Sequence, residues 1–497
     1  MPAALFTRQR STRNAGPVIR RRVLAGRRFS ARSEWRWVPA LVIRLQPVNK
    51  NNKLGTRCME QLKPAPRATA IMVFLLVLNI LNMVDRNLIT SFGSVIIADL
   101  ELSDSQFGLL TGLIFAFFYS VMGLFMGALA DRVNRPRLIA AGLVLWSALT
   151  AVSGTAKSFL EIGLARLFIG VGESAMTPSA MSMLSDLYPR TMRGTASGFY
   201  YLGVPLGAGG SFVVAGLLGP VIGWRNCFYL LGGLGLVLAL LLLAIRDPDR
   251  GAMELSYRAN DRDKQPHEVE LTNNWRQVIG EVMTVVKSVP ALAWTMIGAV
   301  FLHLPLGAGQ FAIVWLERER GFAVGEITAT YGLLFIVFGT AGTFLGGILS
   351  DLYQKRYRGG RVRFLALLII FMMPLMVSFR FVSPDSPLFF IAMASAMFMV
   401  SAFYGPVFST VQDLSPVRLR GVMTGLLLVA CNLLGLGIGA VMTGYISDTL
   451  AAMEVFEPLT KALLVVDLMG IGAPISFMLA SVYLHRVATP KIDSIEA

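Results

Sequence analysis

The chain has few charged residues and few of the side chains that build metal or catalytic centres. Only 15% of its 497 residues are charged, and it contains three cysteines and three histidines. Cys58, Cys227 and Cys431 lack the paired spacing of a zinc or redox site, and the histidines are equally scattered. We therefore expect no metal, no cofactor and no disulfide framework.

Motifs for ATP use and for hydrolysis are also missing. No G-x-x-x-x-G-K-[ST] phosphate-binding loop occurs, which disfavours an ATP-driven pump. No HExxH pattern or nucleophile elbow indicates a hydrolase, so we do not expect an enzyme. A membrane-embedded enzyme stays as the alternative to transport, and product chemistry in proteoliposomes would reveal it.

Apolar sequence is what the chain has in abundance. Hydrophobic residues make up 55% of it and the mean hydropathy is +0.62, which is too apolar for a soluble domain of this length. The net charge of +15 arises almost entirely in residues 1–67, where 16 Lys plus Arg face only Glu34 and Glu60. The remainder is nearly neutral, so nucleic acid is not an expected partner.

Residues 1–67 form a basic leader without the apolar core and cleavage site of a secretory signal peptide. We expect this leader to be disordered. Met59 is a candidate for the physiological start because it lies just ahead of the first apolar stretch. Detection of a native peptide from residues 1–57 by mass spectrometry would refute that start.

Twelve apolar stretches are each about long enough to cross a ~30 Å hydrocarbon core. They predict an all-α membrane protein with spans at approximately 69–98, 106–130, 137–156, 159–186, 192–219, 224–245, 291–316, 325–349, 363–382, 387–412, 420–447 and 459–485. The polar segment 246–289 divides a six-helix bundle at 68–245 from a second one at 290–486, which the tail 487–497 follows.

The loops at the two ends of these spans differ in charge. One set is basic, with Arg and Lys at 132–137, 190–193, 355–363 and 418–420. The other set carries acids at 99–104, 385 and 448–457, so the helices have a basic end and an acidic end. By the positive-inside rule the basic end and both termini are cytoplasmic, in a bacterial-type inner membrane.

The two bundles carry related sequences. The block Asp186-x2-Pro-x3-Arg-Gly-x3-Gly198 recurs at residues 413–425, with every matched position displaced by 227. Gly127-Ala-Leu-Ala-Asp131 recurs as Gly347-Ile-Leu-Ser-Asp351. Duplicated halves of this kind are typical of transporters that bind their solute at the midplane between the halves.

Two acids lie where the predicted helices are deepest in the membrane, and each has an arginine nearby. Asp85 precedes Arg86 in the first span, and Arg166 precedes Glu173 by two turns in the fourth. A charge at the centre of a membrane helix costs roughly 2.5–3.5 kcal/mol, so it usually marks an ion or solute pathway. We interpret Asp85 and Glu173 as proton-coupling acids and the arginines as charge partners or anion-binding groups. The alternative is a static ion pair that fixes two helices.

These motifs resemble a known family. Gly127-Ala-Leu-Ala-Asp131-Arg-Val-Asn-Arg-Pro-Arg137 resembles the loop signature of the major facilitator superfamily, with Asn134 where that signature favours glycine. The motifs around Asp85 and Glu173 resemble those of spinster-like lipid transporters. The resemblance implies two pseudo-symmetric six-helix halves and a lysophospholipid or sphingoid-type solute. Organic-anion symporters of the same superfamily have similar motifs and stay open as the alternative.

The loop that carries the signature is a candidate gate. An acid at the end of a helix can pair with a basic group or a helix N-terminus in one conformation and release it in another. We assign this role to Asp131, Arg132, Arg135 and the repeat counterpart Asp351. The alternative is an anchor that only sets the topology.

Further polar side chains in the spans are candidates to face the solute, although each one alone is more often an interhelical hydrogen bond. These candidates are Tyr119, Tyr200, His303, Gln310, Tyr331 and Asn432. The expected function is alternating-access transport of an amphipathic, lipid-like solute, driven by a proton gradient. Protons, membrane lipids and that solute or an organic anion are the expected partners, and we expect a monomer.

Overall fold

A computed structural model of the chain describes residues 64–65, 67–189, 191–251, 253, 275–323, 325–416 and 419–488. The leader with Met59 and the end of the tail lie outside these residues. All regular structure in the described ranges is helical, and no strand occurs there. The predicted all-α membrane fold is therefore confirmed.

Ten helical stretches among the described residues are long and apolar enough to cross a membrane. One of them, Arg193–Leu243, contains two predicted spans, because Gly223 breaks α10 with a φ of 78°. The fourth predicted span is divided at Ser174 into two shorter helices, which completes the predicted set of twelve.

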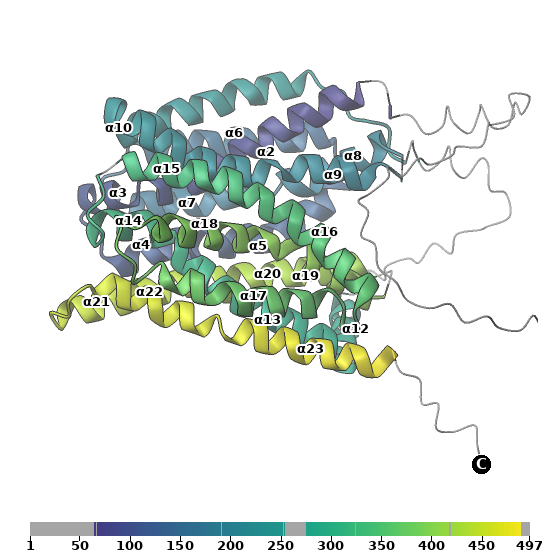
Figure 1. The fold of residues 1–497 in the computed structure, drawn as a ribbon. Coiled ribbons are helices and arrows are strands. Elements are labelled where there is room, and N and C mark those ends of the chain that lie inside the picture. The colour runs from purple at the N-terminus through teal and green to yellow at the C-terminus, as the bar shows by residue number, and fades with distance from the viewer. Residues whose placement is uncertain are drawn as a thin grey trace, which may run out of the picture. The chain divides into compact units, whose positions relative to one another are not determined.

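The first half of the chain forms the helices drawn in purple to teal in Figure 1. These are α2 (Ala68–Ser91), α3 (Gly93–Asp99), α4 (Asp104–Thr111), α5 (Leu113–Ala130), α6 (Arg135–Ser153), α7 (Phe159–Glu173), α8 (Met176–Leu187), α9 (Arg193–Tyr201) and α10 (Gly203–Leu243).

The second half forms the helices drawn in green to yellow (Figure 1). These are α13 (Pro290–Ala308), α14 (Ala312–Arg318), α15 (Glu326–Leu334), α16 (Thr340–Arg356), α17 (Gly360–Ser378), α18 (Pro387–Ala402), α19 (Tyr404–Leu414), α20 (Arg420–Ala430), α21 (Ile438–Ala452), α22 (Pro458–Met469) and α23 (Gly472–Ala488). A 3-10 turn at Gly309–Phe311 and π-helical turns at Phe335–Gly339 and Cys431–Gly437 join helices of single spans.

The predicted linker 246–289 contains an additional helix, α12 (Trp275–Ser288), which packs against α13. Val278 and Val282 are buried on one side of α12, whereas Ile279 is exposed. This spacing of three to four residues makes α12 amphipathic. It is too short to cross a bilayer, which would take about 20 residues.

Several helices begin at residues that the sequence marks clearly. Ser103 and Gln106 form a reciprocal capping box at the start of α4. The side chain of Asn134 caps α6, which has Pro136 in its first turn, and Ser158 caps α7. Each cap satisfies a backbone N–H that would otherwise lack a partner at the helix start.

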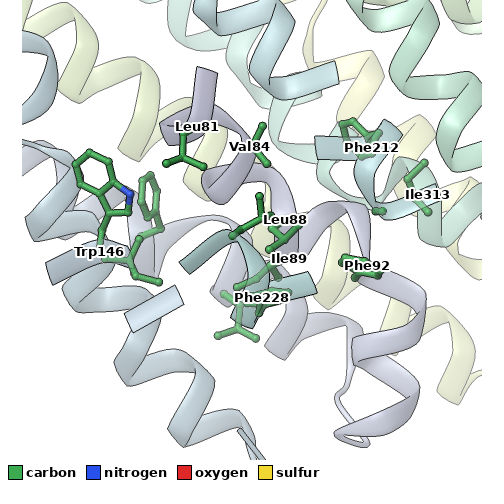
Figure 2. Close-up of a cluster of buried hydrophobic side chains, with 14 of the residues drawn as sticks. Leu81, Val84, Leu88, Ile89, Phe92, Trp146, Phe212, Phe228 and Ile313 are labelled. Atoms are coloured by element: carbon green, nitrogen blue, oxygen red, sulfur yellow. The ribbon is translucent and has the colours of Figure 1, made fainter. Parts of the chain in front are cut away.

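Helix α2 packs along α10, and α10 also packs against α6. Leu81, Val84 and Leu88 of α2 lie between Trp146 of α6 and Phe212 of α10 (Figure 2), and all five side chains are buried. Lipid tails are as apolar as leucine, so such contacts stabilise the bundle through close packing rather than through removal of water. The packing holds one face of α2 against α10 and positions its polar residues.

Hydrogen bonds join the two halves at the acidic end. The Asp104 carboxylate of α4 accepts hydrogen bonds from Arg318 of α14, at 2.9 Å, and from Ser447 of α21, at 2.6 Å. In return, Asp448 accepts hydrogen bonds from the backbone N–H groups of Asp104 and Ser105 at the start of α4. The acidic end is therefore closed in this conformation.

Closure of the acidic end depends on the absence of a side chain at Gly108. A Cβ there would lie 2.5 Å from the carbonyl oxygen of Ala440 in α21. We expect Gly108→Leu to separate α4 from α21, because overpacking of this kind costs about 1–3 kcal/mol. Spin labels at Lys157 and Lys461, one in each half near this end, should show longer distances in the variant.

The matched control is Gly123→Leu, since a Cβ at Gly123 in α5 would meet no atom within 4 Å. Its distance distribution should match that of the parent protein. An unchanged distribution in Gly108→Leu would contradict the assignment of the α4–α21 contact as the closure of this end.

Candidate functional site

The four charged residues predicted to lie at midplane come together between α2 and α7. Asp85, Arg166 and Glu173 are buried, with exposures of 3%, 2% and 1%. The Arg86 side chain keeps 23% exposure. Positions 166 and 173 are about two helical turns apart and therefore share a face of α7.

Arg86 pairs with Glu173 rather than with its sequence neighbour Asp85. Its Nη2 and Nε donate hydrogen bonds to Oε2 of Glu173 at 2.8 and 2.9 Å. Adjacent residues of a helix do not face each other, so Asp85 and Arg86 have different surroundings. The other oxygen of Glu173 is buried and has no hydrogen-bond partner in the part of the chain that the structure describes.

Asp85 points toward α6, where the indole Nε1 of Trp146 donates to its Oδ2 at 3.2 Å. Its Oδ1 is buried without a partner, as is Nδ2 of the neighbouring Asn82. A buried carboxylate with an unbonded oxygen is costly, because the charge has left water without full compensation. Protonation of such a group removes the charge, and a proton-coupling role of Asp85 and Glu173 stays a prediction.

Arg166 holds the cluster together from α7. Its Nη2 donates to the backbone carbonyl of Arg86 at 2.5 Å. The side chains of Phe115 and Tyr119 in α5 stack on each other, and the guanidinium of Arg86 lies 4.2 Å from the Tyr119 ring centre. The guanidinium of Arg166 lies 4.4 Å from the Phe115 ring centre. Such cation–π contacts are worth about 0.5–2 kcal/mol.

Gly170 permits this approach of α5 to α7. A Cβ at this position would lie 3.1 Å from the carbonyl oxygen of Phe115 and 3.2 Å from the amide nitrogen of Tyr119. The glycine within the Arg166–Glu173 motif therefore brings the two aromatic rings under the arginines.

The other predicted polar residues lie apart from this cluster. Tyr200 is completely buried, with its hydroxyl 3.4 Å from Thr177. His303 is buried and its Nδ1 lies 2.7 Å from the Ala299 carbonyl within α13. The Tyr200 contact joins two helices, α8 and α9, whereas the His303 contact lies within one helix, and a role of either residue in solute binding stays a prediction.

Gln310, Tyr331 and Asn432 lie where the two halves meet. The hydroxyl of Thr90 in α2 donates to Gln310 at 2.6 Å. The Tyr331 ring packs edge-on against Phe212 of α10, with ring centres 4.8 Å apart. Asn432 is half-buried in the π-helical turn that packs against α5.

A cavity of about 180 Å³ lies between the two halves, and none of the four charged residues lines it. Asn87 and Thr90 of α2 line its first-half side. Gln310 and Tyr331 line it from the second half, together with Met393 and Val400. Tyr200, His303 and Asn432 do not line it.

The predicted gate residues fall into two groups at the basic end. Asp131 and Arg132 are exposed. Arg135 is completely buried and bonds Asp186 at 2.5 Å and Asp247 at 2.8 Å, all within the first half. In this conformation Arg135 therefore ties the starts and ends of first-half helices together, and its role as a gate stays a prediction.

The second half repeats this arrangement in an exposed form. Arg361, in the first turn of α17, bonds Asp351 and Asp413 at 2.6 Å each. The side chains of these two acids are 55% and 61% exposed. Asp186 and Asp413 are matched positions of the sequence repeat, so both halves join an arginine at the start of the third span to an acid at the end of the fourth.

Sequence reasoning missed three residues of the buried polar network. Trp146 has no signal in the sequence that would mark it as a partner of Asp85. Arg380 and Asp467 form a buried ion pair at 3.0 Å and both line the cavity. Arg380 lies two residues before the end of the predicted span 363–382, and Asp467 lies in the first third of 459–485, so the mid-span criterion that identified Asp85 does not select them.

Comparisons with known proteins agree with this geometry. Residues 75–440 match the family model described as Major Facilitator Superfamily. A crystal structure of a bacterial homolog to the human lysosomal transporter Spinster, in an inward-facing and unoccupied conformation, superposes with a TM-score of 0.68. It is 24% identical and covers 85% of this chain and 97% of that one.

Three curated relatives extend the comparison. An MFS-type efflux pump of Mycolicibacterium smegmatis is 26% identical over 84% of this chain and 94% of its own length. Protein spinster of Drosophila melanogaster is 30% identical over 56% of this chain and 45% of its own. A probable sulfoacetate transporter of Cupriavidus necator is 25% identical over 83% of this chain and 92% of its own.

Proposed function

The chain belongs to the major facilitator superfamily, and from this premise we propose that it is a proton-coupled secondary transporter of an amphipathic, lipid-like solute. Its relatives are transporters and it resembles the spinster-like branch. The solute class is a lysophospholipid or sphingoid-type lipid with an anionic or zwitterionic head group. Alternating access of the two halves moves it across the membrane.

The Arg86–Glu173 pair is the observation that carries this proposal. Its carboxylate is buried, one carboxylate oxygen is unbonded, and its arginine is partly exposed. Protonation of Glu173 removes the charge that holds Arg86, which then becomes free to bind an anionic group. Proton binding and solute binding thus act on one side chain, which is the coupling that a symporter or antiporter needs.

The cavity between the halves supports a solute with a hydrocarbon part. Most of its lining residues are apolar, among them Leu306, Phe335 and Met397. A compact carboxylate would use the arginines but gain little from such a wall. The similarity to protein spinster supports the same choice.

An organic-anion symporter is the second candidate. The arginines of the cluster, Arg86 and Arg166, suit a carboxylate or sulfonate as well as a phosphate. The relative named as a probable sulfoacetate transporter favours this candidate. Short-chain carboxylates should compete with lysolipids for binding only if this second candidate is correct.

We place the protein in a bacterial-type inner membrane with its basic end in the cytoplasm, on the positive-inside rule. The conformation described would then be closed to the outside, because Asp104, Arg318 and Ser447 join the halves at the acidic end.

Purified protein in proteoliposomes should accumulate a labelled lysolipid only when a pH gradient is imposed. A gradient of one pH unit is worth about 1.4 kcal/mol per proton and supports about tenfold accumulation for one proton per solute. Lysolipid movement that is the same with and without the pH gradient would indicate facilitated diffusion. An absence of lysolipid movement, with gradient-driven uptake of a short carboxylate or sulfonate, would favour the organic-anion candidate.

A further inference from the structure

The cavity contains a buried guanidinium that the proton-coupling proposal does not use. Arg380 follows α17 and is 7% exposed. Its Nε donates to Oδ2 of Asp467 in α22 at 3.0 Å. Its Nη1 is buried and has no hydrogen-bond partner among the described residues, although Arg380 lines the cavity.

Neighbouring groups hold this guanidinium in place. Arg380 lies 4.7 Å from the ring centre of Trp315, and Trp315 is itself fixed by a 2.7 Å hydrogen bond to Thr460. Arg320 also lies over the Trp315 ring and donates to the backbone carbonyl of Arg380. The free N–H of Arg380 is therefore part of a fixed arrangement at the junction of α14, α17 and α22.

The rest of the cavity is mainly apolar and adaptable. Five methionines line it: Met373, Met376, Met393, Met397 and Met399. Methionine side chains are flexible and polarizable, so they adjust to apolar groups of different shapes. The volume of about 180 Å³ far exceeds the about 10–15 Å³ that one water molecule needs.

A ligand that satisfies both features has an anionic oxygen attached to an apolar chain. The oxygen accepts from the free N–H of Arg380, in a charge-assisted hydrogen bond, and the chain packs on the methionines. A compact anion would leave the methionine wall uncovered. An uncharged lipid offers this N–H only a neutral acceptor, which makes a weaker hydrogen bond than an anionic oxygen.

We propose that this cavity between the halves is an anion-binding subsite for the solute, in which Arg380 of the second half binds the anionic head group. The two halves then have different roles. Asp85 and Glu173 in the first half bind protons, and Arg380 in the second half binds the solute. Asn87 and Thr90 line the same cavity, so α2 contributes both to the acidic cluster and to the wall of the subsite. The choice of an amphipathic solute rests on the proposed function.

The test compares two probes of equal chain length, a lysophosphatidic acid and an uncharged monoacylglycerol, in equilibrium binding to the purified full chain. Arg380→Gln should lower the affinity ratio of the anionic to the uncharged probe by roughly tenfold, the usual scale for a lost charged hydrogen bond. The affinity of Arg380→Gln for the uncharged probe should stay within about twofold of that of the parent protein.

Arg225→Gln is the matched control. Arg225 also pairs with an aspartate, Asp99, and lies 4.3 Å from the ring centre of a tryptophan, Trp224, but it does not line the cavity. The affinity ratio of the anionic to the uncharged probe should be unchanged in Arg225→Gln. The double variant Arg380→Gln with Asp467→Asn keeps a neutral hydrogen-bonded pair, so it serves where the single variant does not fold, and it should lower the ratio equally.

An unchanged ratio in the Arg380 variants, or an equal loss for both probes, would overturn the subsite and leave Arg380 as a structural pair. The transport proposal is tested separately. If proteoliposomes move no lysolipid but the ratio still depends on Arg380, the transport proposal fails and the subsite stands. If transport occurs and the affinity ratio of the two probes is unchanged in the Arg380 variants, only the subsite proposal fails.

Discussion

Glu173→Gln is expected to abolish the response of transport to a pH gradient while leaving solute exchange intact. Glutamine has the shape of the protonated carboxyl group and still accepts a hydrogen bond from Arg86, but it cannot gain or lose a proton. Gradient-driven accumulation should fall about tenfold per pH unit, to the level seen without a gradient. Exchange of labelled for unlabelled solute needs no net proton movement and should persist.

Glu161→Gln is the matched control for this prediction. Glu161 lies in the first turn of the same helix, α7, where it is exposed and accepts a hydrogen bond from the Lys157 amide. Its removal should leave the gradient response unchanged. Retention of that response in Glu173→Gln would reassign Glu173 to packing or to solute contact.

Asp85→Asn should act in the same direction, because Asp85 is the second buried acid of the cluster. Asparagine keeps an oxygen that accepts from Trp146 at the position of Oδ2. If both neutral variants fold and both keep gradient-driven transport, proton coupling through this cluster is wrong.

Much of this fold could be predicted because membrane spans have a strong signal in the sequence. Every backbone polar group in lipid needs an internal partner, so long apolar stretches form helices. The loop charges and the repeat at Asp186 and Asp413 predicted the division into halves, and the structure places both acids in equivalent arginine pairs. The break at Gly223 was also predicted as a boundary between spans, since two spans were expected there.

The pairing within the site could not be predicted in the same way. Helical spacing showed that Arg166 and Glu173 share a face, but it does not state which arginine of another helix reaches the acid. Arg86 reaches Glu173 and Arg166 reaches the Arg86 backbone because the tertiary fold holds these residues of α2 and α7 at one particular height, where the long arginine side chains span the distance between the helices. Only the tertiary packing determines that height.

The burial of Arg135 likewise could not be predicted from the sequence. Its loop is basic, and an exposed arginine that only sets the topology would have the same local sequence. The difference lies in Asp247, which follows the sixth span and packs back onto the start of α6. The same loop therefore holds an exposed Asp131 and a completely buried Arg135.

Arg135→Gln is expected to destabilise the protein by about 3–5 kcal/mol, the usual cost of breaking a buried charge pair. The guanidinium bonds Asp186 at 2.5 Å, Asp247 at 2.8 Å and the Pro248 carbonyl at 2.6 Å. Glutamine can replace at most part of these contacts and leaves two acids near each other without a counter-charge. Reversible unfolding in mixed micelles, followed by circular dichroism, measures the loss.

Arg361→Gln provides the control that the internal repeat supplies. Arg361 makes the same kind of double pair, but with acids whose side chains are more than half exposed. Water screens these charges, so the loss should be only about 0–1 kcal/mol. The two variants remove one arginine each from equivalent places, and the difference between them isolates the effect of burial.

The same pair of variants separates a structural role of Arg135 from the gate role. A gate residue exchanges partners between conformations, so its loss changes the transport rate more than the stability. A residue that stays bound to Asp186 and Asp247 throughout the cycle lowers stability first, and transport by the folded fraction stays close to normal. Equal stability of Arg135→Gln and Arg361→Gln, with slowed transport in Arg135→Gln alone, would refute the structural role and establish Arg135 as a moving part.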